Sequence, residues 1–295
     1  MIDLIGLRRT LHQNPELALD LPVTRQLLLD ALAPLGLAMH TSASCSSLAV
    51  VVSGAEPGPT VLLRADMDGL PVVEESGEEF SSANGHMHAC GHDLHMAGLV
   101  GAIHQLHRRR AEFAGDVLAV FQPGEEGAGG AELMIGEKTH LLTGRKPVAS
   151  YGLHVLSFAE TGVFFCREGA VMGAAMLFEL ELLGRGGHAA RPHTALDPVS
   201  TAALVRDTVA ELYGAGRYRE LVVPEMISED FSQFLDETGG AFVLVGAAVG
   251  DQSRPLPTNH SPEARFDDSV VPDMSSLLAD LAIRRLNAEM NGTAC

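Results

Sequence analysis

His88-Ala89-Cys90-Gly91-His92-Asp93-Leu94-His95 carries more information than any other stretch of this sequence. It crowds a thiol, three imidazoles and a carboxylate into eight residues. Thiolate and neutral imidazole are the ligands that borderline divalent ions such as Zn²⁺ prefer. A metal is the commonest reason for such crowding, and the alternative is a buried cysteine with histidines on the surface. The octapeptide therefore predicts a metal site, provided that the rest of the chain supplies further ligands.

The composition is that of a large globular protein. The chain has 295 residues, enough for one large or two ordinary domains with a sizeable core. Hydrophobic residues make up 46% of the sequence and charged residues 20%, a balance opposite to that of disordered chains. The formal net charge of -18 argues against nucleic acid as a partner, because phosphate binding depends on clustered lysine and arginine.

No segment of the sequence predicts export or membrane insertion. The four cysteines are scattered and form no CxxC pair, which favours a reducing compartment over a disulfide scaffold. The first residues lack the basic region of a signal peptide, and the longest apolar run, 239–250, is too short to cross a bilayer. We therefore expect a soluble, cytoplasmic protein without a membrane partner.

Short apolar strands alternate with helices on both sides of the octapeptide. The periodicity predicts two N-terminal helices, one containing Ile5 and Leu11 and the other ending at Gly36. Strands are predicted at 47–52, 60–65, 116–121, 148–154, 163–167, 175–183 and 241–245. Helices are predicted at 93–110, 130–135, 197–213, 231–235 and 269–290. This alternation indicates an α/β fold, an open sheet flanked by helices on both faces.

Side chains with catalytic or ligand chemistry stand at or just after the ends of four predicted strands. They are Asp66 and Asp68, Glu125 and Glu126, His154, which closes its strand, and His260. Taken singly, each has an ordinary explanation, since adjacent carboxylates are usually solvated and a buried histidine readily finds a structural partner. Open α/β sheets place their sites at the carboxyl ends of strands. Their shared position is therefore the argument for a common site.

The adjacent acids Glu125 and Glu126 suit a metal hydrolase. They follow an apolar strand and precede Gly127-Ala128-Gly129-Gly130, where side-chain bulk is absent. One acid of such a pair binds the ion, while the other stays free to take a proton from water. Of the further imidazoles, His86, His88 and His95, we expect at most one to contribute, as a partner of a ligand.

Eight motifs together resemble a known family. In chain order they are Arg9–Leu17, Arg64–Pro71, His88–Asp93, Gln122–Gly127, Gly152–His154, Gly187–His193, Ser228–Ser232 and His260–Pro262. They are similar to those of the M20 metallopeptidases, specifically the amidohydrolase branch with hippurate hydrolases, N-acyl-amino-acid deacylases and auxin-conjugate hydrolases. The resemblance covers nearly the whole chain and implies a zinc-exopeptidase-like catalytic domain.

The resemblance also implies a site for two divalent metal ions, drawn from Zn²⁺, Mn²⁺, Co²⁺ and Ni²⁺. Its ligands would be Cys90, His92, Glu126, His154 and His260. Glu125 would be the general base, taking a proton from the water that attacks the amide carbon and returning it to the departing amine. Asp68 would orient a ligand imidazole. The implied substrate is an N-acyl amino acid or a similar small amide.

The chain departs from the family in its lid, a smaller α/β domain that M20 proteins insert into the catalytic domain and usually dimerise through. Where a domain of roughly 100 residues is expected, the strand at 175–183 passes almost at once into Ala203 and the return to the catalytic domain. We therefore predict a catalytic domain formed by 1–173 and 203–295, with 174–202 as a lid remnant. A homodimer is then possible but disfavoured.

The shortened lid leaves two alternatives open. His188, which stabilises the developing oxyanion in relatives, often across the dimer interface, loses its scaffold here. The protein would then bind metal with little or no turnover, although the retention of Glu125 and all five ligands favours activity. A dipeptidase or other exopeptidase is the second alternative, because the same site cleaves peptides in other M20 branches.

Overall fold

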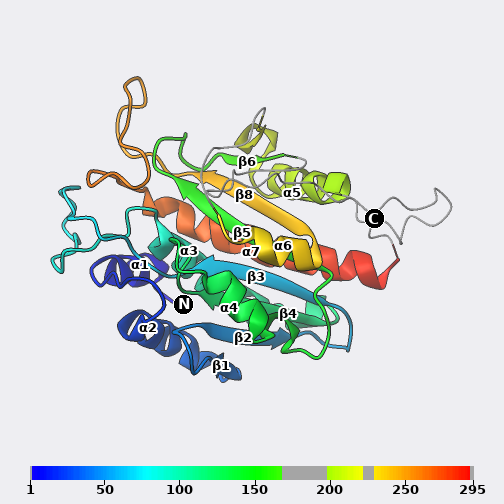
Figure 1. Ribbon diagram of the computed structural model, residues 1–295. Coiled ribbons are helices and arrows are strands. Elements are labelled where there is room, and N and C mark those ends of the chain that lie inside the picture. The colour runs from blue at the N-terminus through cyan, green and yellow to red at the C-terminus, as the bar shows by residue number, and fades with distance from the viewer. Residues whose placement is uncertain (1, 168–197, 222–228, 293–295) are drawn as a thin grey trace.

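Two N-terminal helices precede the sheet (Figure 1). The computed structural model describes these parts of the chain: residues 2–167, 198–221 and 229–292. Helix α1 (Leu4–His12) begins at Asp3, whose carboxylate accepts a hydrogen bond from an amide of the first turn. Helix α2 (Pro22–Leu32) starts with a proline and continues into η1 (Ala33–Leu35), which ends at the left-handed Gly36. Both predicted N-terminal helices are confirmed.

The centre of the described structure is a mixed, eight-stranded sheet in the order β1-β2-β4-β3-β5-β8-β6-β7. Its strands are β1 (Met39–Thr41), β2 (Leu48–Ser53), β3 (Thr60–Asp66), β4 (Asp116–Gln122), β5 (Ala149–Leu156), β6 (Phe164–Cys166), β7 (Tyr218–Glu220) and β8 (Gly240–Gly246). Strands β4, β3, β5 and β8 are mutually parallel, whereas β2 pairs with β4 and β6 pairs with β8 in antiparallel fashion. The carboxyl ends of the four parallel strands therefore meet at one edge, where open α/β folds place their sites.

Helices cover both faces of this sheet, which confirms the predicted fold class. Beyond α1 and α2 they are α3 (His92–Arg108), α4 (Gly130–Gly136), α5 (Pro198–Tyr213), α6 (Ser232–Thr238) and α7 (Val271–Met290), with short 3₁₀ turns η2 (Arg110–Glu112), η3 (Thr139–Leu141), η5 (Ala215–Arg217) and η6 (Asp268–Val270). Helices α3 and α7 pack against each other and against β3 and β5, while α4 and α6 lie on the other face. Successive residues of β3 alternate accordingly, with Val61 and Leu63 in the first core and Leu62 in the second.

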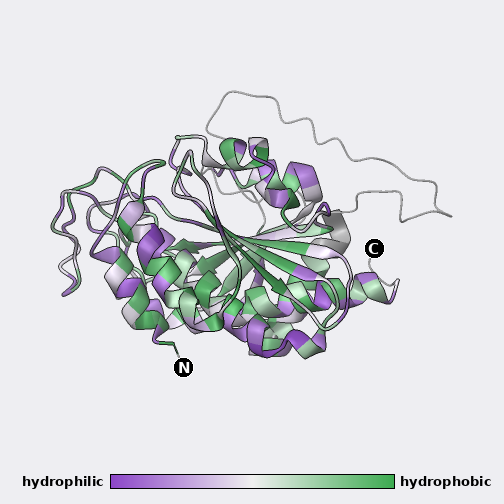
Figure 2. Cartoon of the chain, turned by 90° about the horizontal axis from the view of Figure 1, so that it is seen from below, coloured by the Kyte–Doolittle hydropathy of each residue, from purple (hydrophilic) through white to green (hydrophobic). Residues whose placement is uncertain are grey.

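Hydropathy follows this layering. Figure 2 shows hydrophobic residues concentrated in the strands, while the helices carry hydrophilic residues as well. In the residues that the structure describes, no helix is both long and apolar enough to cross a membrane.

The structure adds two strands and corrects one boundary. Strands β1 and β7, both three residues long and at the sheet edges, are absent from the sequence prediction, because so short a segment carries no periodic signal. His154 does not close its strand: β5 continues to Leu156, so that the imidazole projects from within the strand. The strand predicted at 175–183 lies outside the described residues, and the division into 1–173, 174–202 and 203–295 stays a prediction.

Candidate metal centre

The start of α3 places two candidate ligands side by side. Gly91 precedes the helix with φ of 85°, and a Cβ there would lie 2.4 Å from a methyl carbon of Val155. Only glycine fits this turn, because it tolerates both the left-handed backbone and the close approach of β5. The turn puts Cys90 and His92 on its two sides, and both side chains are buried. Their adjacency in sequence thus becomes adjacency in space.

His92 is oriented by a backbone carbonyl. Its Nδ1 donates to the carbonyl oxygen of Asp68 over 2.8 Å, which fixes the tautomer and leaves Nε2 without a proton when the ring is neutral. This Nε2 is buried and has no hydrogen-bond partner in the described part of the chain. An unsatisfied buried nitrogen costs about 1–3 kcal/mol. Nε2 of His92 is therefore suited to a ligand that the protein itself does not supply.

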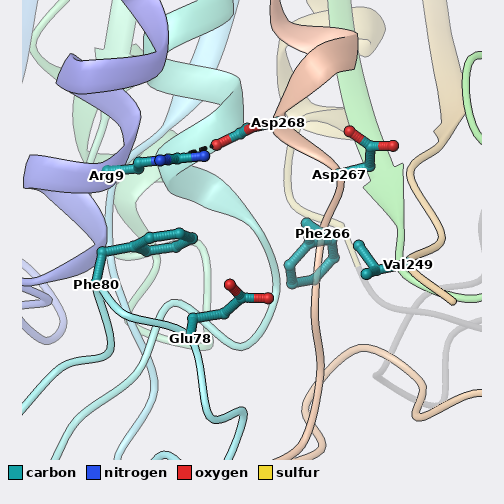
Figure 3. Close-up of a pocket in the computed structure, with 7 residues that line it drawn as sticks. All are labelled: Arg9, Glu78, Phe80, Val249, Phe266, Asp267 and Asp268. Carbon is teal, nitrogen blue, oxygen red and sulfur yellow. Dashed lines mark hydrogen bonds and ion pairs between the residues drawn. The ribbon is translucent and has the colours of Figure 1, made fainter.

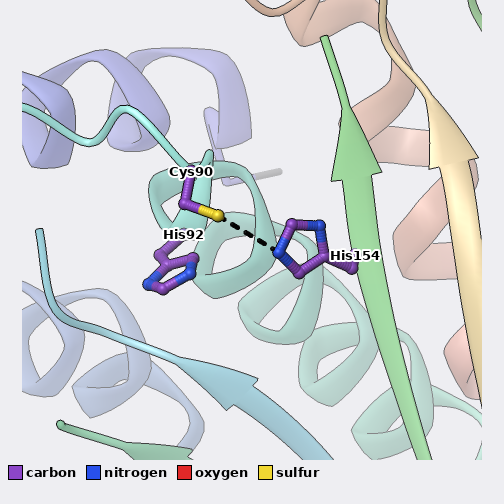
Figure 4. Close-up of side chains that lie close together, drawn as sticks. All are labelled: Cys90, His92 and His154. Carbon is purple, nitrogen blue, oxygen red and sulfur yellow. Dashed lines mark hydrogen bonds between the residues drawn. The ribbon is translucent and has the colours of Figure 1, made fainter. Parts of the chain in front are cut away.

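His154 and His260 approach Cys90 from two other segments. Figure 4 shows the imidazole of His154, on β5, directed toward the thiol of Cys90, with His92 beside them. Nε2 of His154 lies 3.3 Å from Sγ of Cys90, and Nε2 of His260 lies 3.2 Å from the same sulfur. His260 comes from the long connection between β8 and η6. The thiol is thus the common neighbour of two imidazoles.

The turn after β4 brings the two glutamates to the same place. Oε1 of Glu126 lies 3.2 Å from Nε2 of His260 and 3.9 Å from Nε2 of His92, and Oε2 of Glu125 lies 3.9 Å from that same nitrogen. The carboxylate of Asp68 accepts hydrogen bonds from the backbone amides of Glu125 and Glu126, over 3.0 and 3.1 Å. The carboxylate of Asp68 therefore holds the glutamate turn, and its backbone carbonyl, rather than its side chain, bonds the imidazole.

These residues form a donor set that fits divalent metal ions. We call the five side chains the ligand cluster: Cys90, His92, Glu126, His154 and His260. Within it, the potential donor atoms of Cys90, His92 and His154 lie within 4.8 Å of one another, as do those of Cys90, Glu126 and His260. One thiolate, three imidazoles and one carboxylate match the preferences of Zn²⁺ and related transition ions. With the orphaned nitrogen of His92, the donor set fits the kind of metal site that the family resemblance implies.

The electrostatics of the ligand cluster favour a cation. Burial, followed by the charges of Glu126 and Glu125, raises the pKa of the Cys90 thiol well above its usual range. Burial and the neighbouring His95 hold the pKa of His154 well below its usual range, so that this imidazole is neutral, the form that binds metals. A positive ion would offset the repulsion at the thiolate, and its binding would release the thiol proton.

Glu125 stands apart from the ligands in its electrostatics. Its side chain is only 5% exposed, and burial together with the neighbouring Glu229 raises its pKa to about 11. Without a bound cation this carboxyl group therefore holds its proton, and it can accept another only after a positive charge nearby lowers its pKa toward the neutral range. Glu125 thus lies beside the ligand cluster, 3.9 Å from Nε2 of His92, as a candidate for proton transfer.

A second group of buried charges lies behind the ligands. We call it the arginine cluster: Arg64, Asp66, Gln122, Glu229 and Asp230. The guanidinium of Arg64 contacts Asp66 over 2.7 Å, Glu229 over 2.9 Å and Asp230 over 3.1 Å, and donates to Gln122 over 2.9 Å. The sequence predicted only Asp66 among these residues as a strand-end site residue, although an arginine in an apolar strand next to strand-end acids is a usable signal.

Asp66 links the arginine cluster to the ligands through His95. Nδ1 of His95 donates to Asp66 over 2.6 Å, and its Nε2 accepts from the backbone amide of Val155 over 2.9 Å. Asp66 also lies 3.7 Å from Nε2 of His92. Among the three further imidazoles, His95 thus contacts the surroundings of the site. His88 is also buried, and neither of its ring nitrogens has a hydrogen-bond partner in the described residues.

The start of α3 is also tied to α1. Asp93 contacts Nε of Arg8 over 2.8 Å and Nδ1 of His12 over 2.7 Å, and the other ring nitrogen of His12 lies 3.1 Å from Glu74. Burial alone would lower the pKa of His12, but Asp93 and Glu74 outweigh it and raise this pKa to about 9. A charged, buried network therefore anchors the helix whose first residue is His92.

A separate cavity of about 250 Å³ lies between α1 and the segment around η6 (Figure 3). Phe80 and Phe266 form apolar walls, while Arg9 contacts Asp268 over 2.8 Å and Glu78 contacts Arg265. None of the ligand cluster lines it, and it is smaller than a typical ligand pocket. The cavity is therefore not the candidate site.

Seven of the eight predicted site residues come together at the strand ends. These are the five members of the ligand cluster with Glu125 and Asp68. The eighth, His188, lies outside the described residues. Sequence reasoning also missed Asn259, whose side chain contacts the Cys90 segment and β5.

Comparisons with known proteins agree with this geometry. Residues 62–284 match the sequence model of the peptidase family M20/M25/M40. A thermostable carboxypeptidase 2 from Saccharolobus solfataricus is 37% identical over 76% of this chain and 57% of its own length. An IAA-amino acid hydrolase, ILR1-like 5, from Arabidopsis thaliana is 38% identical over 68% of this chain and 46% of its own. The chain thus spans about half the length of these relatives.

Solved structures share the fold. A dinuclear metal-binding peptidase of the M20 family from Bacillus subtilis superposes with a TM-score of 0.78 at 22% identity, covering 96% of this chain and 97% of its own. The matches in sequence and in fold lead to the same conclusion: this chain belongs to the peptidase family M20/M25/M40.

Proposed function

We propose that this protein is a metal-dependent amidohydrolase that cleaves N-acyl amino acids or similar small amides at a site for two divalent ions. One observation carries the proposal: five potential ligands from four segments converge around Cys90, next to the buried carboxyl group of Glu125. Family membership favours a hydrolytic site over a purely structural one, because the relatives are named as a carboxypeptidase and an amino acid hydrolase.

The ligand cluster holds the metal in this proposal. Bound divalent ions would polarise the amide carbonyl of the substrate and acidify a water molecule. The protein's own part is to present its donors without rearrangement, and the 2.8 Å bond from His92 to the Asp68 carbonyl and the burial of Cys90 and His154 do so.

Glu125 moves the proton. It takes a proton from the attacking water and returns it to the nitrogen of the departing amine. Asp68 supports this role by fixing the backbone amide of Glu125, so that the carboxyl group cannot drift from the ligands. Glu229, beside Glu125, favours the protonated carboxyl and so its service as an acid after bond cleavage.

The relatives' names narrow the substrate class. One is a carboxypeptidase and another an IAA-amino acid hydrolase, and both names denote cleavage of an amide whose nitrogen belongs to an amino acid. We therefore propose N-acetyl and N-benzoyl amino acids as first substrates. The carboxypeptidase relatives favour a second candidate, an exopeptidase that releases an amino acid from a peptide.

The test is an assay of amino acid release with Mn²⁺, Co²⁺, Ni²⁺ or Zn²⁺ added to metal-free protein. N-acetyl and N-benzoyl amino acids serve as substrates, with dipeptides in parallel. We expect release from the acylated amino acids, and a Glu125→Gln variant should lose activity by about 10²–10⁴-fold while still binding metal. Metal binding without hydrolysis of either class would instead support the metal-binding alternative, and full activity of Glu125→Gln would refute the assigned base.

A further inference from the structure

Asn259 joins the segments that carry three of the five ligands. Its Nδ2 donates to the backbone carbonyl of Val155 over 2.9 Å and to that of Cys90 over 3.3 Å. Its Oδ1 accepts from the backbone amide of Ser157 over 2.9 Å. One carboxamide thus bonds the segment containing Cys90 and the end of β5, which carries His154, while Asn259 itself directly precedes His260.

His260 is the ligand that needs such support. Its side chain is 47% exposed, whereas His92, Cys90 and His154 are at most 4% exposed. It stands on a long connection rather than on a helix or strand, and its φ is 71°, a left-handed backbone unusual for a residue with a side chain. Its own segment supplies one bond across this turn, from the amide of Ser261 to the carbonyl of Thr258 over 3.1 Å, and further bonds come from neighbouring segments.

Those bonds are made by Asn259 and the backbone around it. The amide of His260 donates to the carbonyl of Ala89 over 2.8 Å, and the hydroxyl of Ser157 donates to the carbonyl of Pro257 over 2.8 Å. Asn259 lies between these two links, and its Nδ2 also faces Sγ of Cys90 at 3.9 Å. An amide N–H directed at a thiolate stabilises its negative charge, although weakly at this distance.

We propose that Asn259 is a positioning residue of the metal centre, whose carboxamide fixes His260 and Cys90 relative to each other for shared metal binding. The inference rests on the metal site of the proposed function. It goes beyond that function because it assigns the position of His260 to Asn259, a residue that is not itself a metal ligand. Partners of metal ligands are worth about 10–100-fold in metal affinity, which makes the role measurable.

The chemistry of the carboxamide explains the choice of residue. Its NH₂ group serves two carbonyl oxygens, and its oxygen serves one amide, so that both ends are used. An aspartate of the same shape would turn an oxygen toward the carbonyls of Val155 and Cys90. An alanine would leave the amide of Ser157 without its partner. Neither change alters a metal ligand.

The test titrates metal-free protein with Co²⁺ and follows the absorption band that arises when a thiolate binds cobalt. The band reports whether Cys90 ligates, independently of any hydrolysis. We expect Asn259→Asp and Asn259→Ala to lower Co²⁺ affinity by about 10–100-fold and to weaken the thiolate band. Asn84→Asp is the matched control, because Asn84 also bonds two backbone groups, at Pro15 and His86, but away from the ligand cluster. It should bind Co²⁺ like the parent.

Thermal unfolding separates positioning from general support of the fold. If Asn259 positions ligands, both variants should unfold near the parent's temperature without metal and should lose most of the stabilisation that metal adds. An equal loss with and without metal would show a structural role and overturn the inference, as would parent-like affinity and thiolate absorption in both variants. If the parent binds no Co²⁺, the proposed metal site fails as well. Metal binding that depends on Asn259 without amide hydrolysis would contradict only the proposed function.

Discussion

The ligand cluster and the arginine cluster lie next to each other at the strand ends, and they differ in how their charge is balanced. In the arginine cluster, the guanidinium of Arg64 contacts three carboxylates and an amide oxygen, so the protein supplies its own cation. In the ligand cluster, one carboxylate and a thiol face three imidazoles, and Nε2 of His92 has no partner in the described residues. Buried polar groups are normally satisfied. The contrast indicates that the arginine cluster is a structural framework that is complete without a ligand, whereas the ligand cluster is completed by a bound cation.

Removing the internal cation should have the largest effect. Arg64→Met leaves the buried carboxylates of Asp66 and Glu229 without their counter-charge, and breaking a buried ion pair typically costs about 3–5 kcal/mol. We expect the free energy of unfolding in urea to fall by that amount. Arg219→Met is the control, because Arg219 pairs with Glu160 at the surface and should change stability by less than about 1 kcal/mol. Equal effects in the two variants would mean that Arg64 is not the framework's cation.

The network between α1 and α3 makes stability depend on pH. The pKa of His12 is about 9 in the folded protein, against about 6.5 in an unfolded chain, because Asp93 and Glu74 offset the cost of burial. The charged imidazole therefore stabilises the fold fully below about pH 6.5, and this contribution is lost as the pH rises through about 9. The difference corresponds to at most about 3 kcal/mol.

Urea unfolding of the parent and of His12→Gln across pH 6 to 10 measures this contribution. We expect the stability gap between the two proteins to narrow as the pH rises. Parallel curves would show that His12 keeps one protonation state throughout. They would mean that Asp93 and Glu74 do not raise the pKa of this imidazole.

Metal binding at the ligand cluster should stabilise the folded protein against unfolding. A ligand that binds the folded state alone adds about 2.7 kcal/mol per site at 100 times its dissociation constant. Thermal unfolding with and without Co²⁺ should show this increment in the parent, and His92→Ala should lose most of it, because the orphaned Nε2 is then gone. A parent protein that gains nothing from any of the four metals would contradict the reading of the cluster as incomplete.

Local motifs, taken together with the family resemblance, were sufficient to propose the five candidate ligands. Cys90 and His92 flank a glycine at the start of a helix, and the two glutamates follow a buried strand, so these motifs can be recognised without the fold. The helices and the long strands were predicted for the same reason, since periodic burial is a local pattern. A site at the strand ends could therefore be proposed before the strand order was known.

The remainder depended on contacts between distant segments. Asn259 is an ordinary loop residue in sequence, and its role arises only where the Cys90 segment and β5 meet. The guanidinium of Arg64 is paired with Glu229 and Asp230, which lie more than 160 positions away in the sequence. The strand order β4-β3-β5-β8 likewise follows from long-range pairing. Such pairings leave no trace in one sequence, whereas each local turn does.

Substitution of Asp68 has the smallest expected effect on stability, and it distinguishes the role of the carboxylate from that of the backbone carbonyl. The sequence predicts that its carboxylate orients a ligand imidazole, but its carboxylate accepts from the amides of Glu125 and Glu126, and its backbone carbonyl contacts His92. Burial raises the pKa of Asp68 to about 6, so at pH 8 the group is charged. Asp68→Asn can accept only one of the two bonds, which should cost about 1.5 kcal/mol, the lower value for a bond to a charged group.

Metal affinity separates the two roles of Asp68. The backbone carbonyl survives in Asp68→Asn, so we expect the affinity for Co²⁺ to change by less than about threefold while urea unfolding records the loss of stability. A fall of about 10–100-fold would instead show that the carboxylate acts on the imidazole, whose Nδ1 lies 3.8 Å from Oδ1. The larger change would mean that the carboxylate of Asp68 supports metal binding. The smaller change would mean that it holds the glutamate turn and has no direct part in metal binding.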